Sequence, residues 1–386
     1  MYLLRIRFLI LYFVVFFFSS ERIVAQTSSQ SLEQYKIVLI GEDDSFEQFL
    51  ERVWKHYEMP AIAAAVVQTN GIIEMATAGY RSLNGKEKVT FNDRFHVGSC
   101  GKSMTTTLAA ILVEEGLLTW DITPLNIFPE LEKNIHPDFR VITLKDLVSH
   151  RAGILPFHSA HDINNMIPDV TGTDQEKRRQ FTRWLLEQGP HVDRGTYEYS
   201  NAGFSIVGAM LEKVTGRSWQ SLMTEKLFKP LGLKTAGFGW PGDNNKNEPS
   251  GHLSRYNNEI YPASLEQNRI PVVFAPAGDI CMSIEDFAKY AMMHLRGLNG
   301  FDGLLKSETI KMLHNSLPRY SFGWGIRNID RRKISTHSGS GGTFYARISI
   351  SHDKNSALVI LTNCATRSGI RSFLNIFAEW VSNFVD

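Results

Sequence analysis

Cysteine is scarce in this sequence, with three residues among 386. Three are too few for a fold that depends on a disulfide framework, and an odd number leaves at least one thiol without a partner in the chain. An excess of one charge is also missing, because 41 Lys and Arg balance 40 Asp and Glu. The chain therefore has no electrostatic reason to bind nucleic acid or an acidic membrane surface.

The composition also lacks the bias of a non-globular protein. Hydrophobic residues make up 43% and charged residues 21% of the chain. These proportions are typical of a globular protein with a sizeable core and exclude a disordered, collagen-like or coiled-coil chain. At about 150 residues per domain, the length allows about two domains.

The N-terminus has an apolar run that is too short to span a membrane. Arg5 and Arg7 precede FLILYFVVFFF, from Phe8 to Phe18, whereas a transmembrane helix needs about 20 apolar residues. A basic start, a short apolar centre and Ala25 beyond it predict a secretory signal peptide over residues 1–25. We expect the mature protein to be exported to the periplasm or the extracellular space, with no stable membrane span.

Two β-rich regions predict a sheet that is built from both ends of the mature chain. After a polar lead-in at 26–45, the run AIAAAVVQTNGIIEMATAGY has the Asn-Gly pattern of a hairpin, and the C-terminal part holds four more short β-rich runs before a last helix. We expect one α/β domain of the α+β type over 46–386, in which an antiparallel sheet from 46–118 and 300–386 is flanked by helices. Residues 119–299 are expected to form an inserted, mostly helical region.

The first candidate for chemistry is Ser99-Cys100-Gly101-Lys102, at the start of an apolar helix. Positions i and i+3 share a helix face, so Lys102 is expected beside the Ser99 hydroxyl. An amine in partly dry surroundings can lose its charge and accept the proton of a hydroxyl nucleophile. The same spacing recurs at Ser351 and Lys354, but between two β-rich runs, where we interpret it as chance.

The second candidate is Tyr199-Ser200-Asn201, in a turn just before a helix. Taken alone, these residue types favour a structural role in a turn. In a catalytic role, Tyr199 could pass protons to and from Ser99, and Asn201 could offer its amide to a substrate carbonyl.

The third candidate is His337-Ser338-Gly339-Ser340, between two β-rich runs. It is either a glycine-rich turn or an edge strand that lines a cleft, where backbone N–H groups face an oxyanion and Gly339 lets a substrate approach. The histidines at 158 and 161 lack the spacing of a zinc site, and no phosphate-binding glycine motif occurs. We expect neither a metal nor an organic cofactor.

In this order, SCGK, YSN and HSG resemble the three motifs of the serine β-lactamase and penicillin-binding-protein superfamily. With a tyrosine in its second motif, the sequence resembles one branch of this superfamily in particular. That branch holds class C β-lactamases, D-alanyl-D-alanine carboxypeptidases, D-aminopeptidases and related esterases. Further segments, among them LKDLVSHRAGI and YSFGWGI, follow the family order. The resemblance spans roughly 46–384 and implies a β-lactamase/transpeptidase-like fold.

The resemblance also implies roles for the motif residues. Ser99 would be the acylated nucleophile, and Lys102 and Tyr199 would share the role of base, with Tyr199 also activating water for deacylation. Asn201 would bind the substrate amide.

On the opposite wall, the resemblance implies that His337 and Ser338 line the site. The backbone N–H groups of Ser99 and Ser340 would form the oxyanion hole. Gly339, which precedes Ser340, would also belong to the substrate-binding residues.

One residue departs from the family pattern. Most class C β-lactamases have Lys at the position of His337, and a histidine is only partly charged near neutral pH. We therefore expect a serine hydrolase for D-amino-acid peptides of peptidoglycan type or for small esters, with such peptides or small molecules as its partners. A class C-like β-lactamase and a non-catalytic penicillin-binding-like protein are the alternatives.

Overall fold

The structure is a computed structural model that describes residues 38–41, 43–242, 247–255, 259–264, 270–329 and 331–385. The predicted signal peptide at 1–25 and most of the predicted lead-in at 26–45 lie outside these residues. In the part of the chain that the structure describes, no helix has both the length and the apolar character needed to cross a membrane.

A six-stranded antiparallel sheet forms the core of the fold, in the order β2-β1-β11-β10-β9-β8. Its strands are β1 (Ala61–Gln68), β2 (Gly71–Gly79), β8 (Gly325–Ile329), β9 (Arg332–Ser340), β10 (Tyr345–Ser351) and β11 (Ala357–Thr362). The predicted hairpin is confirmed, because Ala64 of β1 pairs with Ala76 of β2. On its other side Ala64 pairs with Ile360, so that the two ends of the chain share one sheet.

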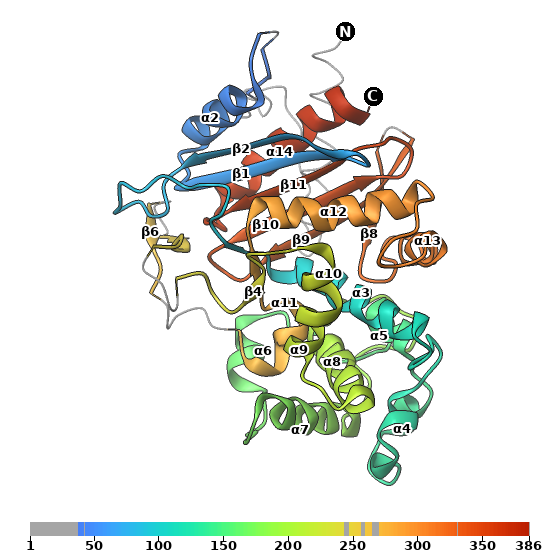
Figure 1. Cartoon of the computed structure of the whole chain (residues 1–386). Coiled ribbons are helices and arrows are strands. Elements are labelled where there is room, and N and C mark those ends of the chain that lie inside the picture. The colour runs from blue at the N-terminus through green and yellow to red at the C-terminus, as the bar shows by residue number, and fades with distance from the viewer. Residues whose placement is uncertain are drawn as a thin grey trace, which may run out of the picture.

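Helices cover both faces of this sheet (Figure 1). On one face lie α2 (Phe46–Tyr57) and α14 (Arg367–Trp380), and on the other lies α12 (Ile284–Leu298). Alternate residues of β1 belong to two separate core clusters, one on each face. A strand that is buried on both faces must be apolar throughout, which explains the continuous run AIAAAVV.

Helix α12 belongs to the sheet layer although its residues fall within 119–299, which the sequence assigned to the helical region. It packs on β1 and β11 and begins after the N-cap Ser283, whose side chain accepts a hydrogen bond from the N–H of Asp286. Its apolar side faces the sheet, and α13 (Ser307–Asn315) packs beside it. Amphipathic helices cover the nearest apolar surface, and here that surface is the sheet.

The helical region lies below the sheet in Figure 1. Its helices are α3 (Gly101–Glu114), α4 (Pro124–Ile127), α5 (Leu144–Val148), α6 (Ala160–Asn165), α7 (Asp174–Glu187), α8 (Asn201–Thr215), α9 (Trp219–Met223), α10 (Lys229–Leu231) and α11 (Ala275–Gly278). Helix α8 ends at Gly216, which adopts the left-handed region (φ 68°) that glycine tolerates best. A buried ion pair of 3.1 Å between Arg178 and Glu212 joins α7 to α8.

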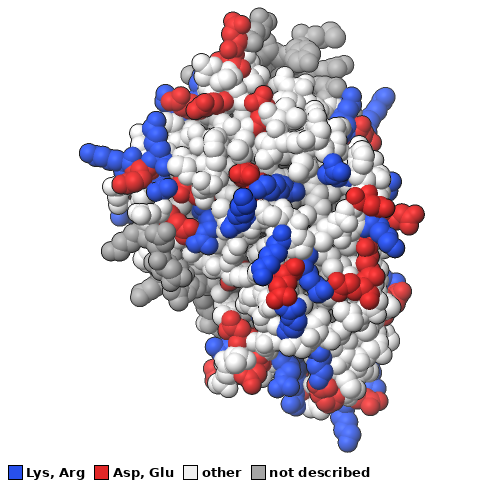
Figure 2. Space-filling model, viewed as in Figure 1, with Lys and Arg blue, Asp and Glu red and all other residues white. Residues whose placement is uncertain are grey.

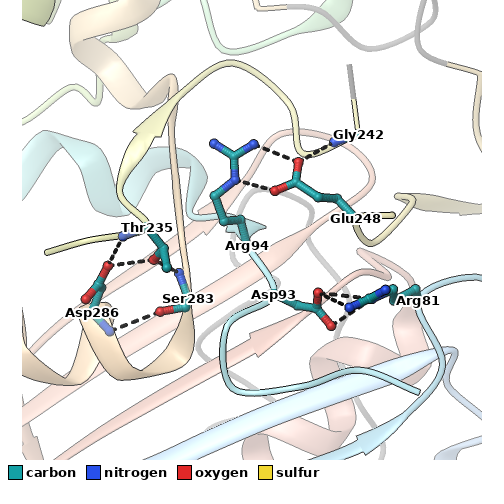
Figure 3. A network of polar contacts seen from close by, with 8 residues as sticks. All are labelled: Arg81, Asp93, Arg94, Thr235, Gly242, Glu248, Ser283 and Asp286. Atoms are coloured by element: carbon teal, nitrogen blue, oxygen red, sulfur yellow. Dashed lines mark hydrogen bonds and ion pairs between the residues drawn. The ribbon is translucent and has the colours of Figure 1, made fainter. Parts of the chain in front are cut away.

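A small sheet connects the two parts, in the order β3 (Phe95–His96), β7 (Ile280–Met282) and β4 (Gly237–Phe238). A further pair, β5 (His252–Ser254) and β6 (Ile260–Pro262), lies apart from it. Figure 3 shows the ion pairs and caps around the small sheet, which involve Arg81 with Asp93, Arg94 with Glu248, and Thr235 with Asp286. Since β3 leads directly into Ser99 and β7 into α12, these contacts fix the entry to α3 against the sheet.

Acidic and basic side chains are interspersed over the face shown in Figure 2, with white surface between them. No large field of one sign covers this face, as the balance of 41 basic and 40 acidic residues leads one to expect.

Candidate active site

Ser99 and Lys102 lie one helical turn apart at the N-terminal end of α3. Ser99 occupies a tight turn over Gly98–Cys100 that runs directly into the helix, and Gly98 adopts φ 51°, in the left-handed region. Lys102 Nζ lies 3.0 Å from Ser99 Oγ. The contact that the i, i+3 spacing predicted is therefore present.

The amine of Lys102 is held in an arrangement that suits its uncharged form. The residue is fully buried, and this burial places the pKa of Lys102 well below its usual value. Nζ lies 2.6 Å from Asn201 Oδ1 and 2.8 Å from the carbonyl oxygen of Ala277, and both atoms can only accept hydrogen bonds. A neutral amine has two hydrogens for these acceptors, so its lone pair faces the Ser99 hydroxyl.

Tyr199 contacts the same serine from the loop that precedes α8. The Ser99 hydroxyl acts on the phenol of Tyr199 and lowers its pKa, and the ring centroid of Tyr199 lies 4.8 Å from Lys102 Nζ. Burial raises the pKa of Tyr199 well above its usual value, so the phenol keeps its proton near neutral pH. The first two motifs thus meet around the Ser99 hydroxyl. Two motifs that matched by chance would not be expected to lie together in this way.

Asn201 lies in the site, but both ends of its amide are engaged within the protein. It follows the N-cap Ser200 of α8. Its Nδ2 donates to the carbonyl of Phe157 at 2.7 Å, and its Oδ1 accepts from Lys102. Asn201 therefore positions the amine of Lys102, and its contact with a substrate amide stays a prediction.

The backbone of β9 runs directly against the turn that carries Ser99. A Cβ atom added at Gly339 would lie 2.7 Å from the backbone nitrogen of Ser99, and one added at Gly98 would lie 2.6 Å from that of Ser340. Only glycine permits this approach. The two N–H groups predicted for the oxyanion hole thus come from neighbouring segments.

His337 and Ser338 point to opposite faces of β9, as consecutive residues of a strand must. His337 pairs with Ile348 and is 6% exposed. The Ser338 hydroxyl acts on the phenol of Tyr345, which belongs to the core under α14. The wall beside Ser99 is therefore made by the His337 side chain and the Gly339 backbone, while the Ser338 side chain faces away from it.

His337 is held in its neutral form. Burial lowers its pKa to about 3, and the neighbouring Lys102 adds to the shift. Nδ1 lies 2.9 Å from the carbonyl of Ser338, which can only accept, so the ring proton is on Nδ1. Nε2 then accepts a hydrogen bond of 2.9 Å from the phenol of Tyr320.

Two residues of the site carried no role in the sequence analysis, His150 and Tyr320. His150, in the left-handed region (φ 59°), packs its ring 4.3 Å from that of Tyr199 and 4.7 Å from that of Tyr320. Its Nδ1 accepts a hydrogen bond from the N–H of Ser200 at 3.1 Å. Both residues stand in segments that were noted for family order, but only the fold shows that they surround Tyr199.

Within the described ranges, no three His, Cys, Asp or Glu side chains converge where they could hold a metal ion.

The chain is similar to proteins of known families. A model of the family described as Beta-lactamase matches residues 46–378. The penicillin-binding protein 4 of Amycolatopsis lactamdurans is 24% identical over 84% of this chain and 85% of its own length. Protein flp of Staphylococcus aureus is 20% identical over 82% of this chain, which spans 62% of that protein, less than two thirds.

Solved structures share the fold. The octameric penicillin-binding protein homologue from Pyrococcus abyssi aligns with a TM-score of 0.70 and 21% identity, over 87% of this chain and 76% of its own. The D-amino acid amidase from Ochrobactrum anthropi aligns with a TM-score of 0.68 and 18% identity, over 86% and 98% of the two chains. The predicted antiparallel sheet with flanking helices and an inserted helical region is thereby confirmed.

Proposed function

The chain belongs to the beta-lactamase family and is a serine hydrolase of the β-lactamase-related group, and we propose that it cleaves amide or ester bonds through an acyl-enzyme at Ser99. One observation carries the proposal. The buried amine of Lys102 lies 3.0 Å from the Ser99 hydroxyl and within hydrogen-bond distance of two atoms that can only accept. In its neutral form the amine gives its two hydrogens to these acceptors, and its lone pair is left for the serine proton. That arrangement is the one a general base needs.

In the acylation step, the Ser99 oxygen attacks the substrate carbonyl while its proton passes to Lys102. The charge that develops on the carbonyl oxygen is stabilised by the backbone N–H groups of Ser99 and Ser340. Tyr199, whose phenol stays protonated, then gives a proton to the leaving amine or alkoxide and regains one from Lys102. In deacylation the same pair removes a proton from water.

The neutral state of His337 supports a preference among substrates. A carboxylate next to the scissile bond, as in penicillins, meets an uncharged imidazole and not a cation at this position. We infer that D-amino-acid amides and small esters, which need no carboxylate at this position, are hydrolysed better than β-lactams, and we also propose D-amino-acid peptides of peptidoglycan type as substrates. The similarity of the chain to a penicillin-binding protein and to a D-amino acid amidase supports this choice. With its predicted signal peptide, the enzyme would act in the periplasm or outside the cell.

The test is intact-protein mass spectrometry after incubation with D-alanyl peptides, p-nitrophenyl esters and penicillins. Wild type should gain the mass of an acyl group from peptides or esters and release it, whereas penicillins should form slowly released adducts. The Ser99→Ala variant should gain none, and Ser351→Ala, in the second S-x-x-K match, should behave as wild type. Rapid turnover of penicillins would identify a β-lactamase instead, and the absence of any adduct or turnover would favour a non-catalytic binding protein.

A further inference from the structure

Three arginine side chains gather around the ring of Tyr197. The guanidinium carbons of Arg151 and Arg319 lie 5.8 Å and 5.9 Å from the ring centroid. The charge of Arg327 acts on the same phenol. A guanidinium over an aromatic face is favourable, but the convergence of three like charges is not.

These cations are not compensated by carboxylates. Arg151 donates to the carbonyls of Pro318 and Tyr320, at 3.1 and 2.9 Å, and Arg327 donates to the carbonyl of Arg319 at 3.2 Å. Among the residues that the structure describes, no ion pair joins any of the three arginines to a carboxylate.

Glu198, whose charge acts on Tyr197, forms no ion pair with any of the three arginines among the described residues. Asp146, which lies near Arg151, is engaged at 2.8 Å by Arg194. Burial, together with repulsion by Arg319, lowers the pKa of both Arg151 and Arg327. The cluster thus holds positive charge that protein carboxylates leave unneutralised.

The cluster is directly connected to the candidate active site. Tyr197 precedes Tyr199 by two residues, and its ring lies 5.9 Å from that of Tyr320. The backbone carbonyl of Tyr320 holds Arg151, while its hydroxyl donates to His337. Arg319, the residue before Tyr320, is exposed, so a solute can reach it from solvent.

We propose that Arg151, Arg319 and Arg327, with the ring of Tyr197 as a platform, bind a carboxylate carried by the substrate at a distance from the scissile bond. The planar guanidinium fork matches a carboxylate, and an anion here would relieve the repulsion among the three cations. This inference rests on the proposed function of the site. It deepens that function, because it names acidic substituents, on the acyl group or on the leaving group, as the feature that the enzyme selects.

The experiment compares two pairs of esters that differ in a single carboxylate. The acyl pair is p-nitrophenyl butyrate and mono-p-nitrophenyl glutarate, and the leaving-group pair is phenyl acetate and 3-carboxyphenyl acetate. In at least one pair, kcat/KM should be about tenfold higher for the acidic ester, which corresponds to about one charge-assisted contact. This preference should shrink as NaCl is raised, because Arg319 is exposed to solvent.

Variants assign the preference to the cluster. Arg319→Ala should reduce the ratio of the two kcat/KM values to about twofold or less, and Arg319→Lys, which keeps the charge, should retain part of it. The matched control is Arg296→Ala, because Arg296, on α12, is another arginine over an aromatic ring, with its guanidinium carbon 5.0 Å from the centroid of Phe301. It should leave the ratio as in wild type.

The outcomes separate this inference from the function on which it rests. If wild type hydrolyses the neutral esters but prefers neither acidic ester, or if Arg319→Ala keeps the preference, the carboxylate site is wrong and the hydrolase proposal stands. If none of the esters is hydrolysed or acylates Ser99, both proposals are contradicted.

Discussion

The phenol of Tyr320 donates a hydrogen bond of 2.9 Å to Nε2 of His337. Because Nδ1 of the same ring faces the carbonyl of Ser338, the imidazole is fixed in one neutral tautomer and one orientation. Tyr320 also packs against the rings of His150 and Tyr199. One phenol therefore holds the wall of the site and supports the tyrosine that contacts Ser99.

Replacement of this phenol tests its positioning role. Tyr320→Phe leaves Nε2 of His337 without its donor in a buried site, which should cost about 1–3 kcal/mol of unfolding free energy. We also expect kcat to fall and the ¹⁵N signals of His337 to show a changed tautomer. Tyr57→Phe, which removes a phenol contact of 3.3 Å to Asn375 far from the site, is the control. An unchanged kcat and tautomer in Tyr320→Phe would contradict the assignment.

The charge state of Lys102 governs the pH dependence of acylation. Because burial depresses the pKa of this amine, its base form persists far below the usual lysine range, and acylation should decline only when acid protonates it. Lys102→Arg introduces a permanent cation and should lower the acylation rate by about 10²- to 10⁴-fold at every pH. Stopped-flow rates with a p-nitrophenyl ester provide the measurement. A wild-type rate that still rose steeply up to pH 10 would show an ordinary lysine.

The contact between β9 and the Ser99 turn predicts a strong effect of one methyl group. In Gly339→Ala the new Cβ would meet the carbonyl of Val97 and lie 2.7 Å from the Ser99 nitrogen, so the strand must move away and separate the two N–H groups. We expect kcat/KM to fall by about 10²-fold or more. Gly303→Ala, where the added Cβ meets no atom within 4 Å, should act as wild type in the same assay. Equal activity of the two variants would argue against this oxyanion hole.

The buried pair between Arg178 and Glu212 should be important for folding. In Glu212→Ala the guanidinium of Arg178 stays buried without its partner, and such a loss costs about 3–5 kcal/mol of unfolding free energy. By contrast, Glu187→Ala breaks a surface pair with Arg183 and should cost at most about 0.5 kcal/mol. Urea denaturation measures both values. Similar midpoints for the two variants would refute the distinction.

Buried histidines make the fold sensitive to acid. Burial lowers the pKa of His294 and His337 to about 3, whereas an unfolded histidine titrates near 6.5. Between these values the unfolded chain binds more protons, so stability falls as the pH falls. From pH 6.5 to pH 5 each should contribute a loss of about 2 kcal/mol.

The variant His294→Gln tests how much His294 contributes to this loss of stability at acidic pH. Its unfolding free energy, measured by urea denaturation from pH 5 to 8, should fall less steeply below pH 6.5 than that of wild type, and the two slopes should agree above pH 7. Parallel curves over the whole range would contradict the assignment.

Much of the fold was predictable because its elements follow local rules. The Asn-Gly hairpin, the N-cap at Ser283 and the Gly216 end of α8 depend on residues within a few positions of each other. The layer to which α12 belongs could not be predicted from the sequence, because the apolar face of a helix does not determine which apolar surface the helix will cover.

The same difference between local and long-range contacts applies to the candidate active site. Ser99 and Lys102 share one helix turn, so their contact and the use of a serine hydroxyl with an amine base could be derived from spacing alone. The roles of His150 and Tyr320, the outward direction of the Ser338 side chain and the arginines around Tyr197 appeared only in three dimensions. Burial, ring packing and the tautomer of a histidine depend on contacts between segments that are separated in the chain, and no local pattern encodes which of these segments will meet.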